Sequence, residues 1–102
     1  MCKSFLQIGA TKIVDAPSTL SQSVEFESTG ETAPICMVSN TTDKVAFITF
    51  ADPAPPTATT EGTVVLPNHQ VPLRKDANNF AAVILEEEPS EGKIYFAPGS
   101  VD

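Results

Sequence analysis

The sequence has no tryptophan, one histidine and two cysteines among its 102 residues. A lone histidine and two distant cysteines cannot supply the ligands of a zinc site. Two cysteines are also too few for a disulfide framework. We expect reduced thiols, with Cys36 a small buried hydrophobe and Cys2 a near-terminal side chain; a disulfide is the alternative. Without tryptophan, the Cys…Trp…Cys spacing of immunoglobulin domains cannot occur.

Basic residues are scarce, with six lysines and arginines against thirteen acids, for a net charge of -7. Such a surface repels phosphate backbones and anionic lipids, so we expect neither a nucleic acid nor a membrane as partner. Long apolar runs are also missing, and none approaches the ~20 residues that span a bilayer. The start has no apolar patch longer than Phe5-Leu6, so we expect the chain to be used without secretion.

Motifs for catalysis or cofactor binding are absent. No glycine-rich phosphate loop and no G-x-S-x-G nucleophile pattern occurs. His69 follows Pro67 in a predicted turn and is interpreted as a solvated side chain. The acidic segment Glu86–Glu91 is interpreted as a solvated loop, with a site for a hard cation such as calcium as the alternative. The sequence therefore predicts no enzyme, no catalytic residue, no cofactor and no metal ligand. The one adjacent basic pair, Arg74-Lys75, is interpreted as a solvated strand end.

What the sequence does contain is short, alternating apolar segments separated by turn residues. The predicted strands are 4–8, 11–14, 22–28, 34–40, 44–50, 63–66, 70–74, 80–85 and 93–97, where the first two are separate or one strand kinked at Gly9. Residues 51–62 carry three prolines and are predicted to form an extended Pro/Thr-rich loop. No stretch supplies a crossover helix, which disfavours a parallel sheet.

This spacing of short strands and turns predicts one all-β domain over residues 1–102. The expected architecture is an antiparallel β-sandwich of seven to eight short strands, with a possible N-terminal arm at residues 1–7. A jelly roll is favoured over an immunoglobulin-like strand order. A barrel would show the same spacing of strands and turns. We expect 34–40 and 44–50 to form a hairpin across the turn-rich 41–43. Segment 80–85 is expected to be a central strand. Pro72 places 70–74 at an edge or a bulge, and Pro98-Gly99 is expected to end the last strand.

Two of the predicted strands, 44–50 and 80–85, are apolar on both faces. In a two-layer sandwich only one face of a strand meets the core, so the other must be covered by a loop, an arm or another subunit. The candidates for a subunit or capsid interface are Ile48, Phe50, Val83 and Leu85. Cover by the N-terminal segment or by the Pro/Thr-rich loop is an equal alternative.

Short segments along nearly the whole chain carry a resemblance. They are Q-I-G-A-T-K and S-Q-S-V near the start, A-F-I-T-F with A-T-T downstream, L-P-N-H-Q-V, F-A-A-V-I, and the closing G-K-I-Y-F-A-P-G. This pattern resembles a group of small β-rich virion proteins of tailed bacteriophages. The chain departs from that group in ending P-G-S-V-D, and in the three prolines of its middle loop.

The resemblance implies a structural protein of the phage virion, made in the host cytoplasm and carried on the capsid surface. It implies a capsid decoration (cement) protein that binds the major capsid protein of the assembled shell, as a homo-oligomer with a trimer favoured. The alternatives are a tail, collar or fibre-associated module and a cellular β-sandwich binding module unrelated to phage.

Overall fold

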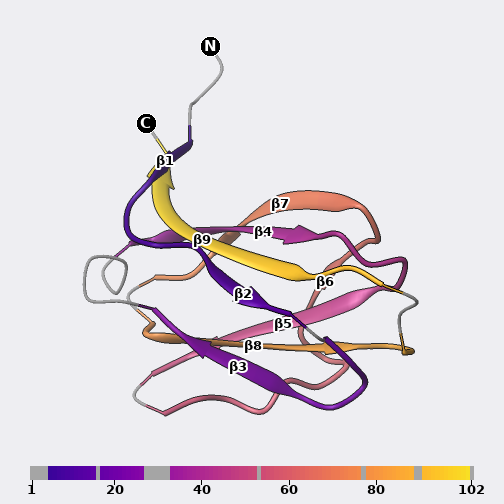
Figure 1. Ribbon diagram of the computed structural model, residues 1–102. Coiled ribbons are helices and arrows are strands. Elements are labelled where there is room, and N and C mark those ends of the chain that lie inside the picture. Colours follow the sequence, from indigo (N-terminus) through magenta and orange to yellow (C-terminus); the bar gives the residue numbers. More distant parts are fainter. Residues whose placement is uncertain are drawn as a thin grey trace.

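The computed structural model describes residues 5–15, 17–26, 33–52, 54–76, 78–88 and 91–101. The described residues form two antiparallel sheets stacked as two layers (Figure 1). The five-stranded sheet contains β1 (Phe5–Gln7), β2 (Lys12–Val14), β4 (Ile35–Asn40), β7 (His69–Arg74) and β9 (Ile94–Val101). The four-stranded sheet contains β3 (Gln22–Glu25), β5 (Ala46–Ala51), β6 (Thr63–Val65) and β8 (Phe80–Leu85). The all-β antiparallel sandwich predicted from the sequence is thereby confirmed.

The strand pairs are nested. Strand β9 pairs with both β1 and β2, β8 with β3, β7 with β4, and β6 with β5. The strands of the first half of the chain therefore pair with those of the second half in reverse order. The two sheets meet where β2 lies beside β3. The described residues include no helix that could span a membrane.

The core lies between the sheets and follows the period-two alternation of the strands. On β4, Cys36 and Val38 point inward and are fully buried, whereas Met37 points outward and is half-buried. The same rule buries Ile94 and Phe96 of β9. Each such side chain stabilises the fold by about 1.5–3 kcal/mol.

The predicted hairpin between 34–40 and 44–50 is wrong. Strand β4 pairs with β7 and β9, whereas β5 pairs with β6 and β8 in the other sheet. The reason lies in the connection, where Asn40 is buried and its side chain bonds the backbone of residues 42 and 44. This bonding turns the chain from one sheet into the other.

Strand β9 also departs from expectation. It continues through Pro98 and Gly99 to Val101, because Phe5–Gln7 pairs with its final residues. Gly9, at φ 95°, separates β1 from β2, so the N-terminal segments are two strands on one partner. The first four residues of the predicted arm 1–7 lie outside the described part. Two expectations are confirmed: β7 lies at an edge of its sheet, and β8 lies between β3 and β5.

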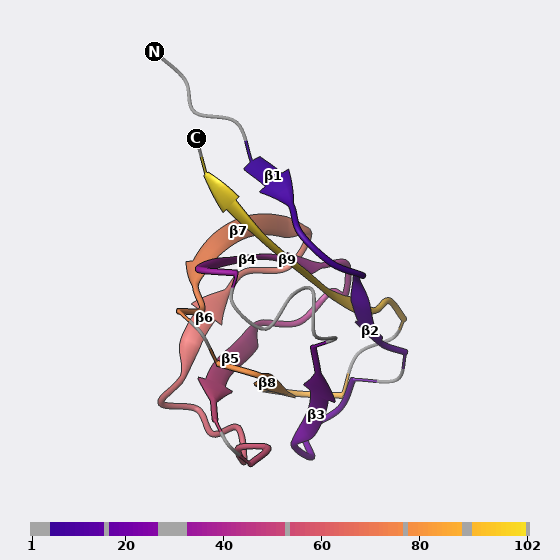
Figure 2. The same cartoon turned by 90° about the vertical axis from the view of Figure 1, so that its left-hand side faces the viewer.

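The Pro/Thr-rich loop crosses the outer face of the four-stranded sheet. Figures 1 and 2 show it beyond β5 and β8, on the side away from the other sheet. Ala58 in this loop is buried, and its N–H donates to Ser21 Oγ at 2.7 Å. Beneath the loop, outward-facing Ala82 is fully buried. The loop therefore covers the second apolar face of β8, as one of the two alternatives predicted.

Candidate functional site

Three of the four predicted interface residues lie in the core. Ile48, Val83 and Leu85 are 1–2% exposed and belong to the cluster between the sheets. In the folded monomer they cannot contact a second subunit, so these three assignments are corrected. The pattern showed that both faces were apolar, but it did not show which face met the core.

Phe50 is half-buried and packs against the edge of the core. It lines an open hollow of about 420 Å³ together with Glu61 and Arg74. Its assignment as an interface residue stays a prediction.

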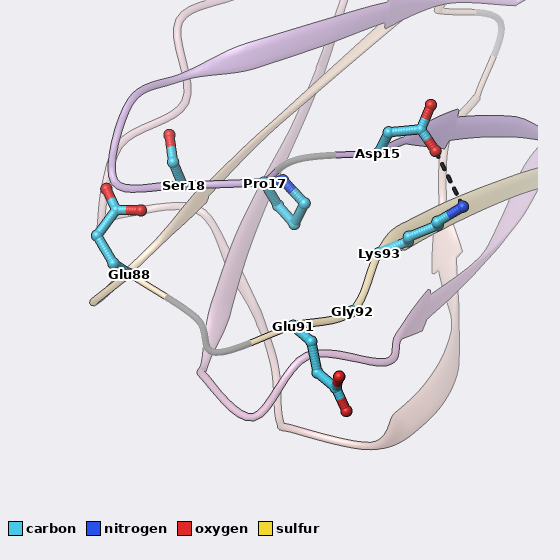
Figure 3. Close-up of a pocket in the computed structure, with 7 residues that line it drawn as sticks. All are labelled: Asp15, Pro17, Ser18, Glu88, Glu91, Gly92 and Lys93. Atoms are coloured by element: carbon cyan, nitrogen blue, oxygen red, sulfur yellow. Dashed lines mark ion pairs between the residues drawn. The ribbon is translucent and has the colours of Figure 1, made fainter.

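The acidic loop borders a second hollow, of about 480 Å³, where the chain passes from β2 to β3 and from β8 to β9. Figure 3 shows that the carboxylates around it point in different directions. Asp15 Oδ1 lies 3.2 Å from Lys93 Nζ, and Glu88 accepts hydrogen bonds from the N–H and hydroxyl of Thr19 at 3.4 and 3.1 Å.

Elsewhere in the acidic loop, Glu87 lies 3.3 Å from Lys44 Nζ. Within the described ranges, no three histidine, cysteine or acidic residues are placed to hold a metal ion together. The arrangement instead fastens the loop to its neighbours, and residues 89 and 90 lie outside the described part.

His69 is the first residue of β7 and is exposed. Its Nδ1 lies 2.8 Å from the carbonyl oxygen of Pro67, a local contact within the turn where Asn68 adopts φ 58°. This placement agrees with a solvated histidine beside a turn.

Sequence reasoning missed the burial of Lys75. Arg74 is a solvated strand end as expected, with its side chain 83% exposed, but Lys75 is fully buried. Lys75 Nζ donates to the Ala33 carbonyl oxygen at 3.1 Å and lies 4.9 Å from the centre of the Phe26 ring. The alternation of β7 could have predicted this burial, because it places position 75 on the inner face with Val71 and Leu73.

Cys36 is buried within the sandwich. Burial raises the pKa of its thiol to about 12, with a smaller opposing effect from the nearby Lys75 charge. The thiol therefore stays protonated and unreactive at neutral pH, as expected for a small buried hydrophobe. Cys2 lies outside the described residues.

Comparison with known proteins finds a similar fold and assigns no function. No known family matches the sequence, and no curated protein matches it. The structure is similar to that of Bacillus endospore appendages, described as a novel family of disulfide-linked pili, with a TM-score of 0.53 and 10% identity over 98% of this chain and 92% of that chain. The coat protein of Tobacco streak virus aligns with a TM-score of 0.39 and 10% identity over 94% and 85% of the two chains. At such identities the first likeness shows the fold alone, and the second is too weak to carry an argument.

Proposed function

We propose that this chain is a non-enzymatic structural protein of a phage virion, a capsid decoration protein that binds the assembled shell and stabilises it. The observation that carries the proposal is the distribution of exposed apolar side chains. Ile13 on β2 is 46% exposed, Val64 on β6 is 51% exposed and Leu66 is 49% exposed, while the core between the sheets is closed. A module built this way presents surfaces to partners and encloses no substrate.

The nested strand order supports the same role, because it is the order that winding one long hairpin into a jelly roll would give, and jelly rolls are frequent in capsid proteins. A protein that binds only the assembled shell stabilises that shell by mass action. Repeated symmetric contacts multiply weak individual interfaces.

The pilus-like neighbour suggests linkage between copies by disulfides as a second way of assembling. The burial of Cys36 argues against it, since a fully buried thiol cannot reach another copy without local unfolding. Cys36 is therefore not the link between copies, and the assembly proposed here uses non-covalent contacts.

The test is the copy number of this chain in purified virions, measured by quantitative mass spectrometry against the major capsid protein. A number comparable to that of the capsid protein supports decoration. A number lower by orders of magnitude would overturn it in favour of a tail, collar or fibre component. Complete absence would overturn the virion role and favour a cellular binding module.

A further inference from the structure

The outer faces of the two sheets differ in cover and in charge. The four-stranded sheet is crossed by the Pro/Thr-rich loop, and exposed acids surround it, among them Glu25 on β3 and Glu86 after β8. In Figures 1 and 2, no described segment crosses the outer face of the five-stranded sheet.

The register places six uncharged, mainly apolar side chains in neighbouring rows on that open face. We call it the uncharged face; it consists of Ile13, Ile35, Met37, Pro72, Tyr95 and Ala97. Ile13 and Pro72 are exposed at its two sides, and the other four are half-buried. Gln70 Nε2 donates to Ser39 Oγ at 2.9 Å at the end of one row.

No described carboxylate lies among these rows, although the chain carries thirteen acids. Among the described residues, charged groups lie at the rim of this face: Asp15 pairs with Lys93, and Arg74, which is opposite Ile35 on the edge strand β7, pairs with Asp76. An apolar centre with a self-neutralised polar rim is the usual anatomy of a protein interface.

We infer that the uncharged face packs against the same face of a second copy of this chain. The net charge of the chain indicates which partner binds the uncharged face. Two copies that each carry -7 repel each other through acid-bearing surfaces, and this face lets them meet without opposing carboxylates. A basic partner would instead be drawn to the acidic surroundings of the four-stranded sheet.

The geometry sets the stoichiometry and the strength. Two copies that pack through the same face are related by a two-fold axis, so the product is a dimer, whereas the resemblance to phage virion proteins implied a trimer. Three strands about 4.8 Å apart and about 20 Å long, together with the three-residue β2 at about half that length, offer about 340 Å² per copy. Two copies then bury about 680 Å² in total, below the roughly 1,200 Å² at which stable specific interfaces begin and in the range of weak, transient contacts. The dimer is accordingly weak and concentration-dependent.

Sedimentation equilibrium of the purified chain, from about 1 µM to about 1 mM, measures this association. We expect a monomer–dimer equilibrium. Ile13→Glu places like charges within the interface and weakens it by about tenfold or more. Val64→Glu is the matched control, because it changes a similarly exposed residue of a three-residue edge strand in the other sheet. In about 0.1 M sodium chloride or more, it leaves the association constant within a factor of about two of the wild-type value, because a charge outside the interface is then largely screened.

Circular dichroism and thermal melting establish that both variants are folded. Pro72→Glu, on the opposite side of the uncharged face, provides a second variant if Ile13→Glu fails to fold. A monomer at every concentration, a trimer, or equal loss in the Val64→Glu control would overturn the inference. The experiment uses this chain alone, so its outcome is separate from the copy number in virions.

Discussion

Asn40 shows how one polar residue sets the path of the chain. It is 1% exposed, and its amide donates to the carbonyl oxygens of Lys44 at 2.8 Å and Val65 at 3.1 Å. Its side-chain oxygen accepts from the N–H and hydroxyl of Thr42 at 3.0 and 2.6 Å. One side chain thus joins the end of β4 to the turn and to β6, and satisfies groups that would otherwise be buried without partners.

Replacing Asn40 by alanine removes the donor to the buried Val65 carbonyl oxygen and the acceptor of the Thr42 N–H, whereas the Lys44 carbonyl oxygen keeps the hydroxyl of Thr42 as a donor at 3.1 Å. We expect Asn40→Ala to lower the free energy of unfolding by about 2–4 kcal/mol, measured by urea denaturation with circular dichroism. Gln70→Ala is the control, since it removes one exposed side-chain hydrogen bond and should change stability by less than about 0.5 kcal/mol. Equal effects of the two substitutions would contradict this role of Asn40.

The Cys36 thiol makes stability depend on alkaline pH. Its folded-state pKa is raised to about 12 by burial, whereas an unfolded cysteine titrates at about 8.5. Above that lower value the unfolded chain releases a proton that the folded chain retains, so the free energy of unfolding falls as pH rises. The limiting slope of this contribution is about 1.4 kcal/mol per pH unit.

We therefore expect wild-type stability to decline between about pH 9 and pH 11, and Cys36→Ala to decline less steeply over the same range. Urea denaturation at several pH values in a Cys2→Ser background measures the two slopes. Equal slopes would show that the thiol does not contribute.

At the scale of elements, the alternation of side chains fixed most of what could be predicted. Strand 70–74 was located because Val71 and Leu73 recur at period two, and Pro72 bars it from a central position. Strand 80–85 was located because it is a continuous apolar run. The pairing of β4 with β9 was not predictable, since it joins residues far apart in sequence. It also depends on which of two apolar faces meets the core. For the same reason Val83 was assigned to an interface and lies in the core.

The Pro/Thr-rich loop acts as a cover for the four-stranded sheet. Its path brings Ala58 over the sheet, and Gly62 passes so close that an added Cβ would lie 2.7 Å from the Ile48 carbonyl oxygen. Three prolines restrict the unfolded chain and lower the entropy lost when the loop is laid down. The loop is thus part of the folded unit.

A charged side chain placed between this loop and the sheet should destabilise the packing of the loop on the sheet. We expect Ala58→Glu to lower the free energy of unfolding by about 1–3 kcal/mol, because the buried methyl group is replaced by a carboxylate without a partner. Limited proteolysis should then cut within residues 54–61 faster than in the wild type. Thr57→Glu changes the exposed neighbour and serves as control. If it destabilises the protein as much as Ala58→Glu, the loop does not cover the sheet through Ala58.

At the scale of the whole molecule, the acid excess and the uncharged face act in opposite directions on self-association. Long-range repulsion between two copies of net charge -7 opposes approach, and contact between the uncharged faces favours it. Salt weakens only the first of these, since the Debye length shrinks from about 30 Å at 0.01 M to about 10 Å at 0.1 M.

Dimerisation should therefore tighten as sodium chloride rises across that range, whereas an interface built on ion pairs would weaken. Sedimentation equilibrium at several salt concentrations measures the trend. The double variant Glu25→Gln, Glu86→Gln removes two exposed negative charges away from the uncharged face. It should tighten the dimer at low salt and match the wild type once repulsion is screened. An association that weakens with salt would mean that the copies meet through ion pairs at the charged rim, because screening weakens the attraction between opposite charges.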